Sequence, residues 1–239
     1  MRLFCFPWAG VGAGVYRPWA GGIRADVEVC AIRPPGRESR LREPAYQDLL
    51  DLADAAGNAI VPLLDRPFAF FGHSLGSWLA FEVIRWLRRE GHRTPVHLFV
   101  SGRRAPHIPA RDTPMHQLPD YEFIMELRRR YGGVPDEVLN DRGLLELLLP
   151  SLRADVTSVE TYNYSGDAPL ACPISAFGGL KDEWVLPEDL QDWKSHTTGA
   201  FRRQMFPGDH FYVESDRSQL LHSVTADLAV AIQKAASTL

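Results

Sequence analysis

The chain has 239 residues, enough to bury one substantial core, so we expect a single domain over residues 1–239. Hydrophobic residues make up 45% and charged residues 23%, a composition that argues against a disordered or fibrous chain. The formal net charge of −4 argues against a nucleic-acid ligand.

The N-terminal segment MRLFCFPWAG enters an apolar strand and then a turn rich in proline and glycine, without the features of a secretory signal. No stretch is long and apolar enough to span a bilayer, so we expect a cytoplasmic protein with no membrane partner. The three cysteines lie in apolar segments without CxxC spacing and are predicted to be buried free thiols rather than metal ligands: Cys5, Cys30 and Cys172.

Apolar segments with strand character alternate with helical segments along the chain. This alternation predicts an α/β protein with a mostly parallel central sheet and flanking helices. A helix is expected from Leu75 to Arg89, with Arg85, Arg88 and Arg89 on its solvent face. The expected strands cover residues 3–6, 27–32, 68–72, 97–102 and 172–179.

Between the fourth and fifth expected strands the pattern becomes helical, over residues of about 106–164. Hydrolases with a nucleophilic serine on a strand-to-helix turn often carry a helical lid at this place, so we predict a lid here. The alternative is that these helices only cover one face of the sheet.

The most informative motif is Gly72-His73-Ser74-Leu75-Gly76, which stands between an apolar strand and an amphipathic helix. A serine on such a tight turn needs small neighbours, and glycine supplies them on both sides. The following helix directs free N–H groups and its positive dipole end toward the serine. The motif therefore predicts that Ser74 is the nucleophile of a hydrolase.

A serine nucleophile needs a base and a carboxylate that orients the base, and in this architecture both follow the serine in the order acid, then histidine. Asp182 follows a late strand and a glycine turn, and His210 follows the segment RRQMF and the turn PGD. We predict these two as the partners of Ser74. Asp209 is interpreted as a turn former, and His196 as a surface or capping residue.

Stabilisation of a tetrahedral intermediate requires an oxyanion hole, commonly two backbone N–H groups. Leu75 supplies the first, directly after the nucleophile. The second is expected from the loop FPWAGVGAG, with Ala9 favoured over Trp8. This loop lacks the spacing of a phosphate-binding or dinucleotide-binding loop, so phosphate binding is disfavoured.

The ordered motifs resemble those of type II thioesterases that accompany polyketide synthases and nonribosomal peptide synthetases, which have the α/β-hydrolase fold. The similarity runs over nearly the whole chain. The segments that carry it are Phe6-Pro7-Trp8-Ala9-Gly10-Val11, RPPGRESR at 33–40, GHSLG at 72–76, LRAD at 152–155, ETYNY at 160–164, GGLKD at 178–182 and FPGDHFY at 206–212. Trp8 and Val11 stand where the family usually has a histidine and a second glycine.

The resemblance implies hydrolysis of acyl or aminoacyl thioesters on the phosphopantetheine arm of acyl or peptidyl carrier proteins, which clears misprimed or stalled assembly lines. It implies no metal or redox cofactor. Arg33, Arg37, Arg40 and Arg42 predict a basic rim for an acidic carrier, unless they pair with nearby glutamates. A general carboxylester or acyl-CoA hydrolase is the alternative, and a non-catalytic binding protein of the same fold is a further one.

Overall fold

The computed structural model describes residues 1–132, 134 and 136–236. Within these residues six strands form one sheet in the order β2-β1-β3-β4-β5-β6, with every neighbouring pair parallel. The predicted α/β-hydrolase architecture is therefore confirmed. The strands are β1 (Arg2–Phe6), β2 (Glu28–Ala31), β3 (Phe68–His73), β4 (Leu98–Ser101), β5 (Ile174–Gly179) and β6 (Phe201–Phe206).

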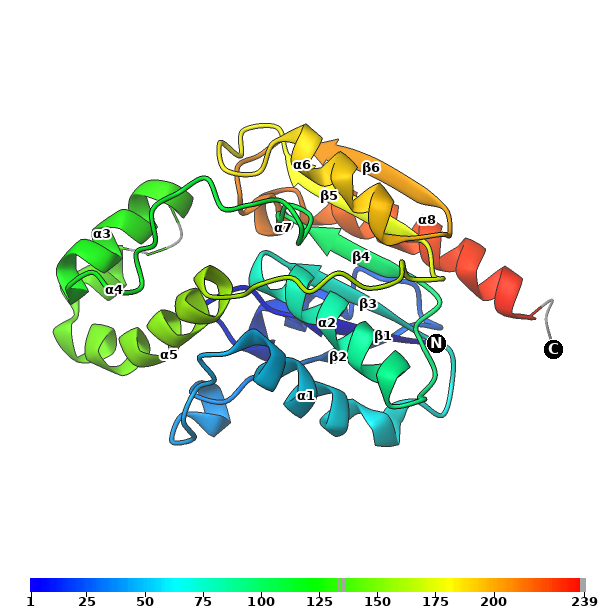
Figure 1. The fold of residues 1–239 in the computed structure, drawn as a ribbon, viewed down its shortest axis with the longest axis horizontal. Coiled ribbons are helices and arrows are strands. Elements are labelled where there is room, and N and C mark those ends of the chain that lie inside the picture. Colours follow the sequence, from blue (N-terminus) through cyan, green and yellow to red (C-terminus); the bar gives the residue numbers. More distant parts are fainter. Residues whose placement is uncertain (133, 135, 237–239) are drawn as a thin grey trace.

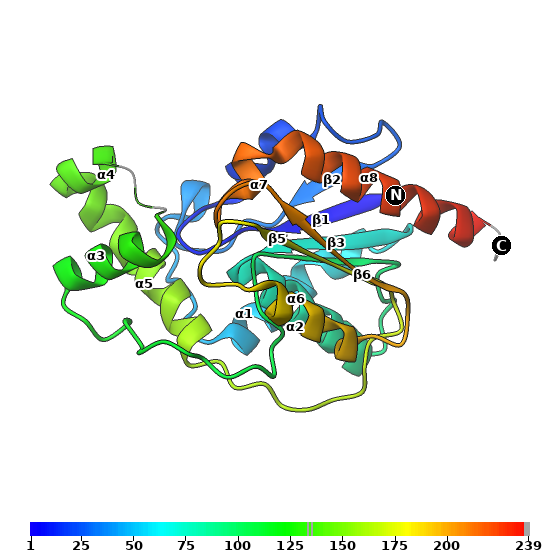
Figure 2. The same cartoon turned by 90° about the horizontal axis from the view of Figure 1, so that it is seen from above.

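Helices cover both faces of the sheet (Figures 1 and 2). One face packs against α1 (Leu49–Ile60), α2 (Leu75–Arg89) and α6 (Pro187–Gln191), and the other against α7 (Tyr212–Ser215) and α8 (Arg217–Ala236). Side chains of a strand point alternately to its two faces. In β1, accordingly, Phe4 and Phe6 join the core beneath α1 and α2, whereas Leu3 and Cys5 join the core beneath α8.

The order of the strands brings two loops together at one end of the sheet. The chain leaves β1 to form β2 on one side and returns to form β3 on the other, so the carboxyl ends of β1 and β3 border a topological switch point, a common place for ligand sites. Phe6 pairs with Gly72 in register. The loop after β1 and the turn after β3 therefore begin side by side.

A helical insertion stands at this end of the molecule, between β4 and β5. It contains α3 (Asp120–Tyr131), α4 (Asp136–Asn140) and α5 (Arg142–Glu160), which includes Pro150. The insertion has its own apolar cluster, centred on Met115, Phe123 and Leu127. Among the described residues, no helix combines the length and apolar character needed to cross a membrane.

Several side chains lie elsewhere than the sequence predicted. Arg85 is buried rather than solvent-facing, because the segment leading from α5 to β5 crosses α2, and Arg85 donates to the carbonyl of Ser165 in it (Figure 1). His196 is buried rather than on the surface, and its ring contacts His107. All three cysteines are free, but Cys30 is only half-buried.

Candidate active site

Ser74 occupies a strained turn between β3 and α2. Its backbone has φ 52° and ψ −117°, a conformation that residues with a side chain rarely adopt. Neighbouring glycines make room for the turn. A Cβ on Gly72 would lie 2.0 Å from the carbonyl oxygen of Gly76, and one on Gly76 would lie 2.1 Å from that of Phe6. The geometry is that of a nucleophile elbow, in which the serine side chain projects away from the sheet.

His210 and Asp182 meet although they are 28 residues apart. Asp182 follows β5 and His210 follows β6, so the two adjacent strands deliver both side chains to the same edge. Nδ1 of His210 lies 2.7 Å from Oδ2 of Asp182, a distance suited to an N–H donating to a carboxylate. The other carboxylate oxygen accepts from the N–H groups of Trp184 and Val185, which fixes its orientation.

The neighbouring Asp209 has a different contact. Its Oδ1 accepts from the N–H of Phe211 at 2.8 Å, the hydrogen bond of an Asx turn, as expected for a turn former. The Asp209 carboxylate thus shapes the loop that carries His210.

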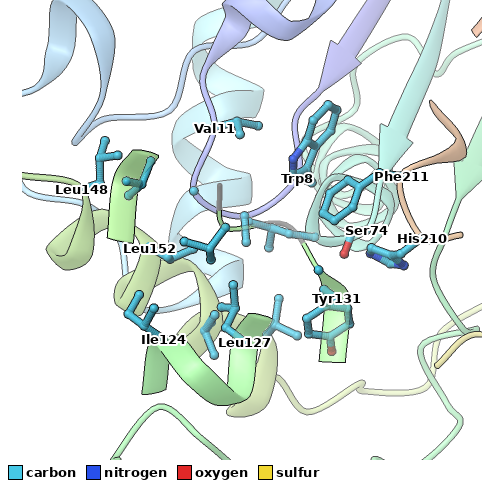
Figure 3. Close-up of a pocket in the computed structure, with 18 of the residues that line it drawn as sticks. Trp8, Val11, Ser74, Ile124, Leu127, Tyr131, Leu148, Leu152, His210 and Phe211 are labelled. Carbon is cyan, nitrogen blue, oxygen red and sulfur yellow. The ribbon is translucent and has the colours of Figure 1, made fainter. Parts of the chain in front are cut away.

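Ser74 and His210 face a common cavity of about 550 Å³. In Figure 3 the hydroxyl of Ser74 lies beside the imidazole of His210, at one side of this cavity. Apolar side chains from the helical insertion form most of the opposite wall: Ile124, Leu127, Leu145, Leu148, Leu149 and Leu152. A cavity of this size and lining suits an apolar ligand that reaches Ser74.

The two predicted oxyanion donors, Leu75 and Ala9, line the same cavity as Ser74. Leu75 is the first residue of α2, so its N–H has no carbonyl four residues earlier in the helix to bind. Ala9 belongs to the loop after β1 and lines the cavity. Trp8 also lines the cavity, with its ring 5.4 Å from that of His73 and 6.0 Å from that of Phe211.

Sequence reasoning placed His73 beside the serine but gave it no further role. Its Nδ1 lies 2.8 Å from the Ser101 hydroxyl, which in turn contacts the hydroxyl of Tyr212. Its ring lies 5.1 Å from that of His210. Burial, and then the neighbouring His210, lower the pKa of His73 well below its usual value. The His73 ring therefore stays neutral where it packs against the ring of His210.

Other residues at the cavity had no distinguishing signal in the sequence. The Tyr131 ring lies 5.0 Å from that of His210, although it comes from α3 in the insertion. Arg103 is buried and stacks on Trp78 at 3.8 Å, and burial lowers its pKa to about 9. Because these residues follow apolar or mixed segments rather than a motif, only the fold reveals that they border the site.

The predicted basic rim is largely wrong. Arg37 is only 3% exposed and forms a buried ion pair. Arg33 pairs with Glu38 at 2.7 Å, and Arg40 pairs with Glu43 at 2.5 Å. Neutralised in this way, the segment after β2 offers much less free positive charge to a partner than its arginine count indicates.

Comparison with known proteins places the chain in a family. The family described as "Thioesterase domain" matches residues 1–228. The gramicidin S biosynthesis protein GrsT of Aneurinibacillus migulanus is 40% identical over 232 residues, covering 97% of this chain and 90% of GrsT.

Two solved structures agree with this assignment. The type II thioesterase BorB from the borrelidin biosynthetic cluster is 35% identical, with a TM-score of 0.85 over 94% of this chain and 91% of BorB. ClbQ from the colibactin NRPS/PKS pathway is 30% identical, with a TM-score of 0.91 over 96% of this chain and 97% of ClbQ. The chain therefore belongs to the thioesterase family, and its sequence and fold group it with the type II thioesterases.

Proposed function

We propose that this thioesterase removes acyl or aminoacyl groups from the phosphopantetheine arm of acyl or peptidyl carrier proteins, and so clears misprimed or stalled biosynthetic assembly lines. The observation that carries the proposal is the shared cavity: an elbow serine and a carboxylate-oriented histidine meet at one side of an apolar cavity. The similarity to GrsT, BorB and ClbQ supports a carrier-bound substrate.

In the proposed mechanism, Ser74, His210 and Asp182 form a catalytic triad. The Ser74 hydroxyl attacks the thioester carbonyl carbon while Nε2 of His210 takes its proton. The backbone N–H groups of Leu75 and Ala9 bind the resulting oxyanion. Asp182 holds the His210 ring in the required tautomer and stabilises its positive charge.

Collapse of the tetrahedral intermediate breaks the carbon–sulfur bond, and His210 returns the proton to the departing pantetheine thiolate. His210 then takes a proton from water as the water oxygen attacks the acyl-serine ester. The second intermediate expels the Ser74 oxygen, which recovers its proton from His210, and the acyl group leaves as a carboxylic acid. No step needs a metal or redox group.

Serine-directed labelling tests the nucleophile. A fluorophosphonate should label the native chain, and Ser74→Ala should abolish both labelling and hydrolysis. The matched control is Ser195→Ala, because Ser195 is exposed in a short helical turn away from the cavity, and this variant should be labelled normally. Undiminished labelling of Ser74→Ala would remove the assignment.

A substrate comparison tests the carrier. One acyl group is presented on a carrier protein, on coenzyme A, on a truncated pantetheine thioester and as an oxygen ester, and kcat/KM is measured for each. We expect the highest value for the carrier. Equal values for the carrier and coenzyme A would indicate a general acyl-CoA hydrolase, and a preference for the oxygen ester would indicate a carboxylester hydrolase.

We further propose that the helices at 106–164 act as a lid, because α3 and α5 wall the cavity and pack around a small apolar cluster of their own. Hydrogen exchange should be faster there than in the sheet and should slow when a nonhydrolysable acyl-pantetheine occupies the site. Protection equal to that of the sheet, with no response to the acyl mimic, would identify a fixed wall.

A further inference from the structure

Three segments far apart in the sequence meet at one buried ion pair. Nη1 and Nη2 of Arg37 donate to the two carboxylate oxygens of Asp155, at 2.8 and 2.9 Å. Arg37 lies in the loop after β2, and Asp155 lies on α5 of the insertion. The N–H of Gly10, in the loop after β1, donates to the same carboxylate at 2.7 Å. The side chains of Arg37 and Asp155 are only 4% and 2% exposed.

This ion pair binds the backbone of the loop after β1 at two points, the N–H of Gly10 and the carbonyl of Val11. Besides the Gly10 N–H bound by Asp155, the carbonyl of Val11 accepts from Nη1 of Arg37 at 3.1 Å. Contact between α5 and the loop is also direct, because a Cβ on Gly10 would lie 2.7 Å from Cδ1 of Leu152. Gly10 has φ +80°, so the turn itself favours glycine.

The bound N–H belongs to the peptide unit that joins Ala9 to Gly10. Because the Gly10 N–H donates to Asp155, it is not free to bind an oxyanion, and the Ala9–Gly10 peptide is held in one orientation. The loop can then present the Ala9 N–H to the cavity, where Ala9 is found. A preorganised donor of this kind is effective only if its direction is fixed before the oxyanion forms.

The ion pair also neutralises the negative charge of Asp155 beside the loop after β1. A lone buried carboxylate at position 155 would repel the negative charge that develops on the substrate oxygen, since charges interact strongly in a site with little water. The bidentate guanidinium of Arg37 neutralises it, while the two groups satisfy each other's hydrogen bonds.

We propose that Arg37 and Asp155 are positioning residues for the oxyanion donor: they lock the loop after β1 against α5 and cancel the charge beside it. The proposal rests on the proposed function, because it takes Ala9 as an oxyanion donor. It assigns one shared purpose to the RPPGR and LRAD segments, neither of which contributes a member of the triad.

The test is a mutant cycle read by steady-state kinetics on an acyl-carrier substrate. Arg37→Gln should lower kcat about 10²-fold, the size of effect expected for a misplaced oxyanion donor, and should change KM by less than about threefold. Arg37→Lys keeps the positive charge but cannot bind both oxygens of Asp155 as the guanidinium does. It should therefore lower kcat less than Arg37→Gln does. Asp155→Asn should cause a smaller loss than Arg37→Gln, because an asparagine oxygen can still accept from Gly10.

The double variant Arg37→Gln with Asp155→Asn should regain about tenfold in kcat over Arg37→Gln, because it removes the unpaired carboxylate. Glu82→Gln is the matched control, since Glu82 pairs with Arg85 in a buried ion pair that does not touch the loop after β1. It should lower the melting temperature without lowering kcat. If Arg37→Gln does not fold, the kcat and KM values of Arg37→Lys and Asp155→Asn, compared with those of Glu82→Gln, test the positioning role instead.

Folded Arg37 variants with native kcat, or a double variant no better than Arg37→Gln, would overturn the positioning role. So would a loss that appears only in KM or only in thermal stability. Labelling of Ser74 separates this failure from that of the proposed function: if Ser74→Ala abolishes hydrolysis while the Arg37 variants keep native kcat, the triad stands and the positioning role falls. If Ser74→Ala remains active, both fail.

Discussion

Asp182 and Asp209 both lie next to His210, one in space and the other in sequence, but only Asp182 reaches its ring. Asp182→Asn should therefore lower kcat by a factor on the order of 10³–10⁴, because an amide favours the wrong tautomer of His210. Asp209→Asn is the matched control and should stay within a few-fold of the native value, since its oxygen can still accept from Phe211. A larger loss from the Asp209 change would reverse the assignment.

The elbow depends on the absence of a side chain at position 76. In Gly76→Ala the new methyl group would meet the backbone oxygen of Phe6, which cannot move without disturbing β1. We expect a loss of about 1–3 kcal/mol in the free energy of unfolding and slower labelling of Ser74 by a fluorophosphonate. Gly166→Ala, where a methyl group meets nothing within 4 Å, should behave as the native chain. Native labelling and stability in Gly76→Ala would contradict the elbow.

The far wall of the cavity should set the length of the acyl chain. Leu148 and Ser74 lie at opposite sides of the pocket in Figure 3, so Leu148→Trp should shorten the space without touching the reacting atoms. We expect kcat/KM for a decanoyl carrier to fall at least about tenfold relative to an acetyl carrier. Leu147→Trp, at an adjacent and half-exposed position, is the control. An unchanged ratio for Leu148→Trp would place the acyl chain elsewhere.

Acid should destabilise the chain through His196. Burial, and then the neighbouring His107, lower the pKa of His196 to about 4, from about 6.5 in an unfolded chain. Below pH 6.5 the unfolded state therefore binds the proton more strongly, and stability falls as the pH drops toward 4. From this residue alone we expect a loss on the order of 2 kcal/mol between pH 7.5 and 5.

Urea unfolding of His196→Gln at the two pH values checks this expectation. The variant should lose less stability than the native chain between pH 7.5 and pH 5. His222→Gln, which changes an exposed residue of α8, should retain the native pH dependence. Identical pH dependence in all three proteins would show that His196 is protonated as easily in the folded state as in the unfolded one.

The sheet was predictable because its strands carry continuous apolar residues between turn signals. All five expected strands are present, and α2 runs from Leu75 to Arg89 as predicted. Helix α1 was not predicted, although its buried residues recur at helical spacing and Asp48 caps its start by accepting from the N–H groups of Leu50 and Asp51.

The residues of the candidate site were predictable where they follow a strand of the central sheet. Ser74, Asp182 and His210 are of this kind, and the structure brings Asp182 and His210 into contact. The burial of Arg37 was not predictable, because its partner comes from a distant segment. Arg37 is buried by Asp155, 118 residues away, and no local pattern distinguishes it from Arg33 or Arg40.

Pro150 lies near the middle of α5, the helix that both lines the cavity and contacts the loop after β1. Proline has no N–H to donate to the preceding turn, so the helix is weakest there. Beyond it, Arg153 donates to the carbonyls of His116 and Leu118, and Asp155 accepts from the N–H of Gly10 in the loop after β1. Side chains on both sides of Pro150 line the cavity, Leu148 before it and Leu152 beyond it. Under the proposed function, one helix both bounds the acyl chain and fixes the loop of the oxyanion donor, so a substitution in α5 that changes acyl-chain preference can also change kcat.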